Sequence, residues 1–466
     1  MLAPHNSHAG AEGLHMRSLS LKAIDPTATP CSPLEVKCRF DRAARAAKHK
    51  KHGCIRLLAA VMLLYGWSMA AHAAFNTAAP AASRLRDADF MASVNSAFTK
   101  IYNLDFDAAS DDLAHLERQY PEHPGPPLYR ALVLWLEQLD EAHELTPDCF
   151  LHPACFAASV HTPGEQAARQ RIQALLDASR ARCDRRSANE QNGADTLYYR
   201  GAVEALTAAI AVTLDRNNFD GIRHAGQAKG TCGQLMRGDP PYDDAALISG
   251  LYDYLFSQAP WYVRWLTGGD KKQGMEAVNH AAEKGTWTRD DAILVRMLMR
   301  MHEGLLAEAM KDAALLSEKY PRSYLFPLAQ GQILDKMGKH EDADAVYSRI
   351  LELADESKPN YQRIGLSRFR WEMGNRRLST DPQAAMRLYQ AILEDPGSEE
   401  RWRVLAQLQS GCALDLLGRH EEAVKRYQAV LAMRDYDNSH ALASRDLTQG
   451  STPGGRRISI PRLSTP

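Results

Sequence analysis

The chain has 466 residues, of which 45% are hydrophobic and 24% are charged, and its 56 Lys and Arg nearly balance its 57 Asp and Glu. These values are typical of a soluble globular protein, and they exclude a wholly disordered chain, a collagen and a polytopic membrane protein. A chain of this length holds about three domains of roughly 150 residues, or one extended repeat array. A dedicated nucleic-acid binder would be basic overall, so no nucleic acid is expected as a partner.

The first 73 residues carry the layout of a secretory signal. They hold ten Lys and Arg against four Asp and Glu, whereas the rest of the chain is acidic. A basic cluster at 48–56 precedes an apolar run from Leu57 to Ala71, and Ala71-His72-Ala73 offers the small residues that a signal peptidase reads. The run is shorter than the roughly 20 residues of a membrane-spanning helix. We therefore expect a signal peptide at 46–73 and a periplasmic or cell-envelope protein. The alternative is that this segment remains uncleaved as an anchor, which would then be the sole contact with the membrane.

The two ends of the chain are expected to lack a fold. Residues 1–45 precede the signal and show little apolar periodicity, which indicates either a disordered leader or a misannotated start, with the natural start near Leu34–Val36. Residues 436–466 are rich in Ser, Gly, Pro and Arg, and we interpret them as a disordered tail.

From about residue 83 onward the pattern is helical. Apolar residues recur at spacings of three and four, Gly, Pro and Asp interrupt them every 12 to 20 residues, and long alternating runs of β-branched residues are missing. The sequence therefore predicts an all-α chain. We divide it into a divergent helical-repeat region at 83–300 and a region of clearer repeats at 301–435.

The repeats are visible as recurring small and aromatic residues. The segments that begin at Gly338 and Gly418 both read Gly, basic, His, acidic, acidic, Ala, with a Tyr nine residues after the Gly, and 381–389 keeps the Ala and the Tyr. Small residues let two helices approach closely, and an aromatic ring fills the gap to the next pair. The residues expected to pack the repeats are Gly331, Gly338, Ala343, Tyr347, Ala385, Tyr389, Gly411, Gly418, Ala423 and Tyr427.

This pattern resembles the tetratricopeptide repeat (TPR), in which two antiparallel helices occupy about 34 residues. A further run from Gly250 through Gly269, Gly274 and Gly285 is similar to exported bacterial TPR proteins and to the outer-membrane-linked helical repeat family. The resemblance covers about 95–435. It implies a TPR-like α-solenoid of antiparallel helix pairs, and it implies no particular activity, because the biochemical role of those proteins is mostly unknown.

Stacked helix pairs leave an extended concave face, so we expect an exported scaffold that binds a protein or peptide partner in the cell envelope. An aromatic-rich stretch at 252–265 suggests the floor of a groove, with bulky packing between helices as the alternative. Polar residues on the first helix of each pair could bind a peptide backbone, or simply be solvated. The residues proposed to contact the partner are Tyr252, Tyr254, Trp261, Trp265, Gln330 and Gln407.

The alternative function is an envelope carbohydrate-binding protein or hydrolase built on a helical toroid. It would need two carboxylates that face each other across the aromatic stretch, for which Asp243, Asp244, Asp253 and Asp270 are candidates. Asp270 is also placed to cap a helix that begins at Lys271. The glycines beside it lack the Gly-Lys-Ser/Thr ending of a nucleotide-binding loop.

The sequence offers no catalytic motif, and we expect neither enzyme activity nor a cofactor. Each of the four His-Glu pairs lacks a second His four residues after the first, which excludes a zinc-protease helix, and no metal site is expected.

Cysteine use is compatible with export. We expect one disulfide between Cys149 and Cys155, another between Cys183 and Cys232, and a buried thiol at Cys412. The alternative for both pairs is free, buried cysteines.

Overall fold

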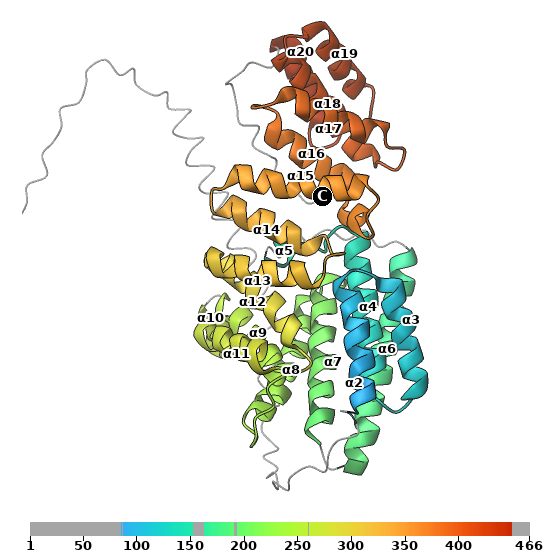
Figure 1. Cartoon of the computed structure of the whole chain (residues 1–466), viewed down its shortest axis with the longest axis vertical. Helices are drawn as coiled ribbons and strands as arrows, with labels where there is room; N and C mark the ends of the chain where they lie inside the picture. Colours follow the sequence, from blue (N-terminus) through green and yellow to red (C-terminus); the bar gives the residue numbers. More distant parts are fainter. Residues whose placement is uncertain (1–84, 86, 152–162, 191–192, 260, 450–466) are drawn as a thin grey trace, which may run out of the picture. The chain divides into compact units, whose positions relative to one another are not determined.

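The computed structural model describes residues 85, 87–151, 163–190, 193–259 and 261–449, and within them all regular secondary structure is helical (Figure 1). The predicted leader, the predicted signal peptide at 46–73 and residues 450–466 lie outside the described residues. No described helix is long and apolar enough to cross a membrane. The helices are α2 (Ala88–Tyr102), α3 (Phe106–Gln119), α4 (Gly125–Glu141), α5 (Pro147–Leu151), α6 (Pro163–Glu190), α7 (Ala194–Thr213), α8 (Asn218–Met236), α9 (Ala245–Ser257), α10 (Trp261–Thr267), α11 (Lys271–Lys284), α12 (Arg289–Glu303), α13 (Leu306–Lys319), α14 (Leu325–Lys336), α15 (His340–Asp355), α16 (Leu366–Arg377), α17 (Pro382–Glu394), α18 (Glu400–Leu416), α19 (His420–Leu431) and α20 (Ser439–Gln449).

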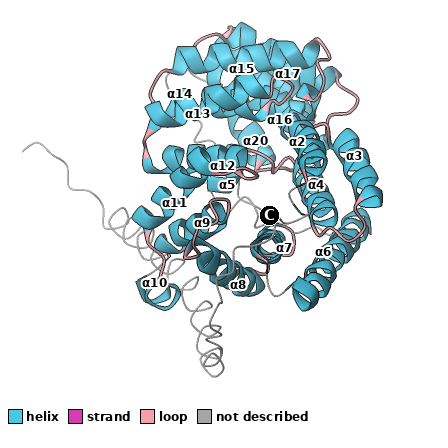
Figure 2. Cartoon of the chain, turned by 60° about the horizontal axis from the view of Figure 1, so that its bottom comes forward, coloured by secondary structure: helices cyan, strands magenta, loops and turns pink. Residues whose placement is uncertain are grey.

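Most helices pack against the helix that follows them in the sequence (Figure 2). Loops of a few residues join the members of each pair, so that neighbouring helices run antiparallel. Hairpins whose main contacts are with their sequence neighbours are the building principle of a solenoid. The chain is thus an all-α, TPR-like helical-repeat protein over its described part.

Glycines in the left-handed conformation turn the chain between the paired helices. Gly338 lies between α14 and α15 with φ of +76°, and Gly418 lies between α18 and α19 with φ of +75°. The next amide in each turn reaches back to a carbonyl of the preceding helix: Lys339 N donates to Leu334 O at 2.9 Å. This geometry closes the end of a helix at low steric cost only where the residue lacks a Cβ atom.

A tyrosine ring rests against a bare glycine backbone in three successive hairpins. A Cβ atom on Gly331 would lie 2.3 Å from Cε1 of Tyr347, and one on Gly411 would lie 2.4 Å from Cε1 of Tyr427. Tyr389 meets Gly374, in α16, at the same 2.4 Å. The predicted alanines at 343, 385 and 423 are fully buried beside these tyrosines. The contact therefore sets how closely the two helices of a hairpin approach.

The hydroxyl of each of these tyrosines is bound by the opposite helix. Tyr347 donates to Asp335 Oδ2 at 2.9 Å, and Tyr427 donates to Asp415 Oδ2 at 2.8 Å. The other oxygen of Asp335 contacts His340 Nδ1 at 3.0 Å, at the start of α15. Burial acts to raise the pKa of Asp335, but hydrogen bonds from His340, Arg376 and Tyr347 and the charge of Arg376 outweigh it and hold this pKa below its usual value. The aspartate therefore joins both helices and the turn between them.

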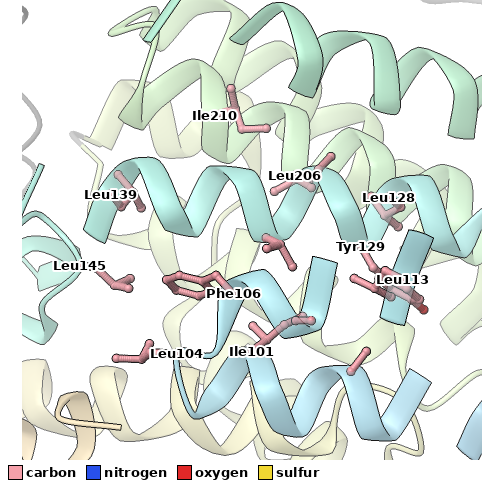
Figure 3. Close-up of a cluster of buried hydrophobic side chains, with 14 of the residues drawn as sticks. Ile101, Leu104, Phe106, Leu113, Leu128, Tyr129, Leu139, Leu145, Leu206 and Ile210 are labelled. Carbon is pink, nitrogen blue, oxygen red and sulfur yellow. The ribbon is translucent and has the colours of Figure 1, made fainter. Parts of the chain in front are cut away.

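The buried core runs between the hairpins. Figure 3 shows Ile101, Phe106, Leu139 and Leu206 converging from α2, α3, α4 and α7. Burying large side chains contributes roughly 1.5–3 kcal/mol each, which makes this the main stabilising term. A separate apolar cluster lies among α17–α20.

Segments far apart in the sequence meet at the turn between α2 and α3. Asn103 Oδ1 accepts from the backbone N–H of Arg322 at 3.0 Å, and Asp105 pairs with the Arg322 guanidinium at 2.7 Å. Asn360 donates to the Asn103 carbonyl at 2.6 Å. The first described hairpin is thereby bound to residues more than 200 positions later.

The prediction of a disordered tail from residue 436 was wrong over 439–449, which form α20. Ala443 in this helix is fully buried, and Leu442 and Leu447 pack onto the cluster of α17–α20. Asp446 accepts from the Cys412 thiol at 3.8 Å. The sequence reasoning judged the segment by the composition of 450–466 and overlooked a short apolar face. α20 packs against α18 and α19 and covers the apolar surface of that hairpin.

Replacing Gly331 or Gly411 by Ala should lower the free energy of unfolding by about 1–3 kcal/mol, because the methyl group overlaps a tyrosine ring. Gly226→Ala in α8 is the matched control: a Cβ atom there meets nothing within 4 Å. That change should be neutral, or stabilising by up to about 1 kcal/mol. Chemical denaturation followed by circular dichroism measures all three, and equal effects at 226 and 331 would contradict the close-approach argument.

Ala443→Asp should destabilise the chain by at least about 2 kcal/mol, because it places an unpaired carboxylate in the interface of α20. The neighbouring Ser444 is exposed, so Ser444→Asp should change stability little. Thermal denaturation of the two variants compares them. If the two variants melt alike, α20 does not cover the hairpin of α18 and α19.

Candidate functional site

The predicted aromatic contact residues do not line one groove. Tyr254 is buried, and its hydroxyl lies 2.8 Å from His302 Nδ1 and donates to Glu303 Oε1 at 3.1 Å. Tyr252 is half-buried and packs on Phe256 with 4.2 Å between ring centroids. These two tyrosines therefore pack α9 against its surroundings, which was the alternative reading of the stretch.

The two tryptophans of the stretch lie on the surface. Trp261 is 74% exposed and Trp265 is 78% exposed, one turn apart on α10. They border a shallow hollow together with Arg264, Gly268 and Asp270. Exposed large aromatic side chains are common where proteins meet partners.

The two glutamines predicted to contact a partner are less accessible than the two tryptophans. Gln407 accepts a hydrogen bond from Arg426 Nη1 at 3.0 Å, within its own hairpin of α18 and α19. Gln330 is half-buried on α14.

Each of the four aspartates proposed for a hydrolase has a local structural partner. Asp244 Oδ1 accepts the backbone N–H groups of 286–288 at 2.8–3.0 Å and thereby shapes the turn before α12. Asp270 caps α11 by accepting from Gln273 N at 2.9 Å, as predicted. Asp253 pairs with Lys229, and Asp243 lies 2.7 Å from His280. These contacts do not bring two carboxylates together across an aromatic surface.

Sequence reasoning missed a cavity between helices that lie far apart in the sequence. A cavity of about 490 Å³ lies among α2, α4, α7, α9, α12 and α13, whose arrangement is drawn in Figure 2. Its size falls within the 300–1,000 Å³ of typical ligand pockets. The aromatic lining residues are Phe98, Tyr102, Tyr129, Tyr198, Trp287 and Tyr320. We call this cavity the central pocket.

The rings of the central pocket are held in place by one another. The centroids of Phe98 and Tyr129 are 5.0 Å apart in an edge-to-face arrangement, and those of Tyr102 and Tyr320 are 4.7 Å apart. The Tyr129 and Tyr199 hydroxyls are hydrogen-bonded at 3.1 Å. A wall of mutually packed rings is preorganised for an apolar or cationic group.

Two neighbouring carboxylates, in the first turn of α12, provide the polar side of the central pocket. Asp290 Oδ2 accepts from Lys319 Nζ at 2.6 Å and from the Tyr320 hydroxyl at 2.5 Å. Asp291 Oδ1 accepts from the Tyr102 hydroxyl. No cation of the described residues forms an ion pair with Asp291, whereas Asp290 is paired with Lys319. The pocket therefore holds one uncompensated carboxylate.

Burial raises the pKa of Asp291 to about 6, and the nearby carboxylates of Asp290 and Asp244 act in the same direction. The hydrogen bond from Tyr102 opposes this rise only in part. Burial, followed by the negative charge of Asp291, raises the pKa of Tyr102 well above its ordinary value, so that this hydroxyl remains a donor.

The predicted disulfide between Cys183 and Cys232 does not form. Cys183 in α6 and Cys232 in α8 are separate, buried thiols, and burial raises the pKa of each to about 12. Both helices pack against α7, and the two thiols form no disulfide with each other. Cys149 is buried, but Cys155 lies outside the described residues, as does any bridge between them. Cys412 is buried, as predicted.

Among the described residues, no group of three or more His, Cys, Asp and Glu side chains is arranged to hold a metal ion.

No protein-family model matches the chain, and no curated protein matches it. Among solved structures, a tetratricopeptide repeat protein from Parabacteroides merdae is 12% identical over 77% of this chain and 98% of that chain, with a TM-score of 0.26. A monomeric mutant of IFIT1 with m7Gppp-AAAA is 13% identical over 78% of this chain and 80% of that chain, with a TM-score of 0.22. Likeness at this level says nothing about the function of this chain, and the fold assignment rests on the helix pairing described above.

Asp291→Asn should change the dependence of stability on pH. Because the folded pKa of about 6 lies above that of an unfolded aspartate, this carboxyl favours the folded state below about pH 4, and its contribution is lost as the pH rises through 6. Relative to the wild type, the variant should therefore gain about 1–3 kcal/mol between pH 4 and pH 7.5. Urea denaturation at the two pH values measures the difference.

Asp342→Asn is the matched control, since Asp342 is the third residue of α15, as Asp291 is of α12, but is exposed. Its effect should be the same at both pH values to within about 0.5 kcal/mol. An equal pH dependence for the two variants would contradict the assignment of an uncompensated, enclosed carboxylate at Asp291.

Proposed function

We propose that the protein is an exported, non-enzymatic TPR-like scaffold that binds a protein or peptide partner in the cell envelope. The central pocket receives a part of that partner. The observation that supports this proposal is the pocket itself: an aromatic-walled hollow of about 490 Å³ with two carboxylates, assembled from helices that span residues 88 to 319. Pockets of this build, mostly apolar with a few converging polar groups, are the usual form of a binding site.

Export is the part of the proposal that depends on the sequence alone. The basic cluster, the apolar run and the Ala71-His72-Ala73 site at 46–73 support it. Fractionation of the source cells, with detection of the mature N-terminus, checks this part separately from binding.

The exposed Trp261 and Trp265 favour a second candidate, a carbohydrate-binding protein of the cell envelope. An indole face can cover the apolar face of a sugar ring, and Arg264 and Asp270, beside the same hollow, offer a hydrogen-bond donor and acceptor for hydroxyl groups. The two candidates predict different sites, so that variants distinguish them.

The experiment compares two variants with the wild type as baits for partners in envelope fractions, quantified by mass spectrometry. Ala205 lines the central pocket, and Ala205→Phe should fill part of it and reduce recovery of the partner at least tenfold. Trp261→Ala combined with Trp265→Ala should leave recovery unchanged. Circular dichroism confirms that both variants fold.

The outcomes separate the candidates. Loss of the partner with Ala205→Phe alone supports the proposal. Loss with the tryptophan variant alone, together with binding of the wild type to envelope glycans, replaces it by the carbohydrate-binding function. Recovery that neither variant changes, or no partner at all, contradicts a binding role for the central pocket.

A further inference from the structure

The charge distribution of the central pocket restricts what can occupy it. Among the described residues, Asp290 and Asp291 are its acidic lining residues, and Arg289 and Lys319 are its basic lining residues. Lys319 is already bound to Asp290, and the exposed Arg289 forms no ion pair with Asp291 within 4 Å. An occupant that carries a positive group would supply the missing partner of Asp291.

The hydrogen-bonding capacity that Asp291 has left also favours a cationic occupant. Its Oδ1 accepts from Tyr102, and no described residue donates to its Oδ2. The side chain is only partly exposed, and Asp291 is one of the residues that line the pocket. A carboxylate held away from bulk water without a cation is costly, and a hydrogen-bonding cation placed against it recovers much of that cost.

The aromatic walls suit the same kind of group. Phe98, Tyr102, Tyr129, Tyr198 and Tyr320 surround the hollow, and the faces of such rings attract an ammonium group as well as an alkyl chain. An anionic occupant would meet Asp290 and Asp291. A neutral apolar occupant would cover Asp291 and leave it without a partner. A cation with an apolar body satisfies both parts of the lining.

We propose that the central pocket recognises an alkylammonium group, with its charge at Asp291 and its carbon chain among the aromatic rings. This inference rests on the proposed function, and it names the chemistry of the part that enters the pocket. Two sources carry this group: the side chain of a lysine in a partner protein or peptide, and a free small-molecule amine.

The test measures the binding of three probes of equal length to the wild-type protein by calorimetry and saturation-transfer NMR at pH 7.5. The probes are n-hexylammonium, 1-hexanol and hexanoate. The ammonium probe should bind at least tenfold more tightly than the alcohol, and hexanoate should bind most weakly. Equal binding of the ammonium and alcohol probes overturns the inference.

Variants locate the selectivity. Asp291→Asn should reduce the preference for ammonium over alcohol to within about twofold, whereas the matched Asp342→Asn should preserve it. Ala205→Phe should weaken the binding of all three probes to a similar extent. Because the selectivity is first measured on the wild type, the inference remains testable if a variant fails to fold.

Two peptides distinguish the sources. The peptides are acetyl-Gly-Lys-Gly-amide and its counterpart with norleucine in place of lysine. If the lysine peptide binds more tightly than both hexylammonium and the norleucine peptide, the source is a partner side chain. If hexylammonium binds more tightly than the lysine peptide, the source is a free amine. If all three hexyl probes bind equally and Ala205→Phe abolishes their binding, the cation inference fails while the proposed binding function stands. If no probe depends on the pocket, the cation inference fails, and the capture experiment above decides the proposed function independently.

Discussion

The approach of a tyrosine ring to a glycine backbone determines how the helices of this protein pair. In three consecutive hairpins the ring occupies the space that a side chain on the opposite helix would need, at Gly331, Gly374 and Gly411. The hydroxyl of the same ring is bound by Asp335, Asn375 or Asp415 on that helix. A single side chain thus provides apolar packing and satisfies a buried polar group, which fixes both the distance and the alignment of the two helices.

Carboxylates have two different roles in the chain. Asp244 accepts three backbone N–H groups and the Thr288 hydroxyl, and it shapes a turn. Asp291 accepts from one phenol and borders a cavity. The first arrangement is one that a folded chain needs for its own stability. The arrangement at Asp291 leaves hydrogen-bonding and charge-pairing capacity that folding does not use, and unused capacity of this kind is common in binding sites.

Much of the fold could be predicted because helical repeats leave a local record. The turn between paired helices has a left-handed conformation that requires glycine, at Gly338 and Gly418. A tyrosine follows each glycine at the same spacing, Tyr347 and Tyr427. The central pocket left no such record. Asp290 and Asp291 read as ordinary acids in the first turn of a helix, and their proximity to Tyr102 depends on how α2 and α12 meet. Sequence spacing reports neighbours along a helix, and a cavity lined by residues 94 to 320 is not built from such neighbours.

The contacts of the α2–α3 turn have a consequence for synthesis of the chain. Asn103 is bonded to Arg322 and Asn360, which lie 219 and 257 positions later. At elongation rates of about 5–20 residues per second, a ribosome adds those residues roughly 10–50 s after Asn103. Unlike a purely neighbour-by-neighbour array, which can consolidate as it emerges, the nascent N-terminal hairpin must wait for a distant segment before its polar turn is satisfied. Formation of this turn therefore includes a long-range docking event, and its rate reflects chain topology more than helix formation.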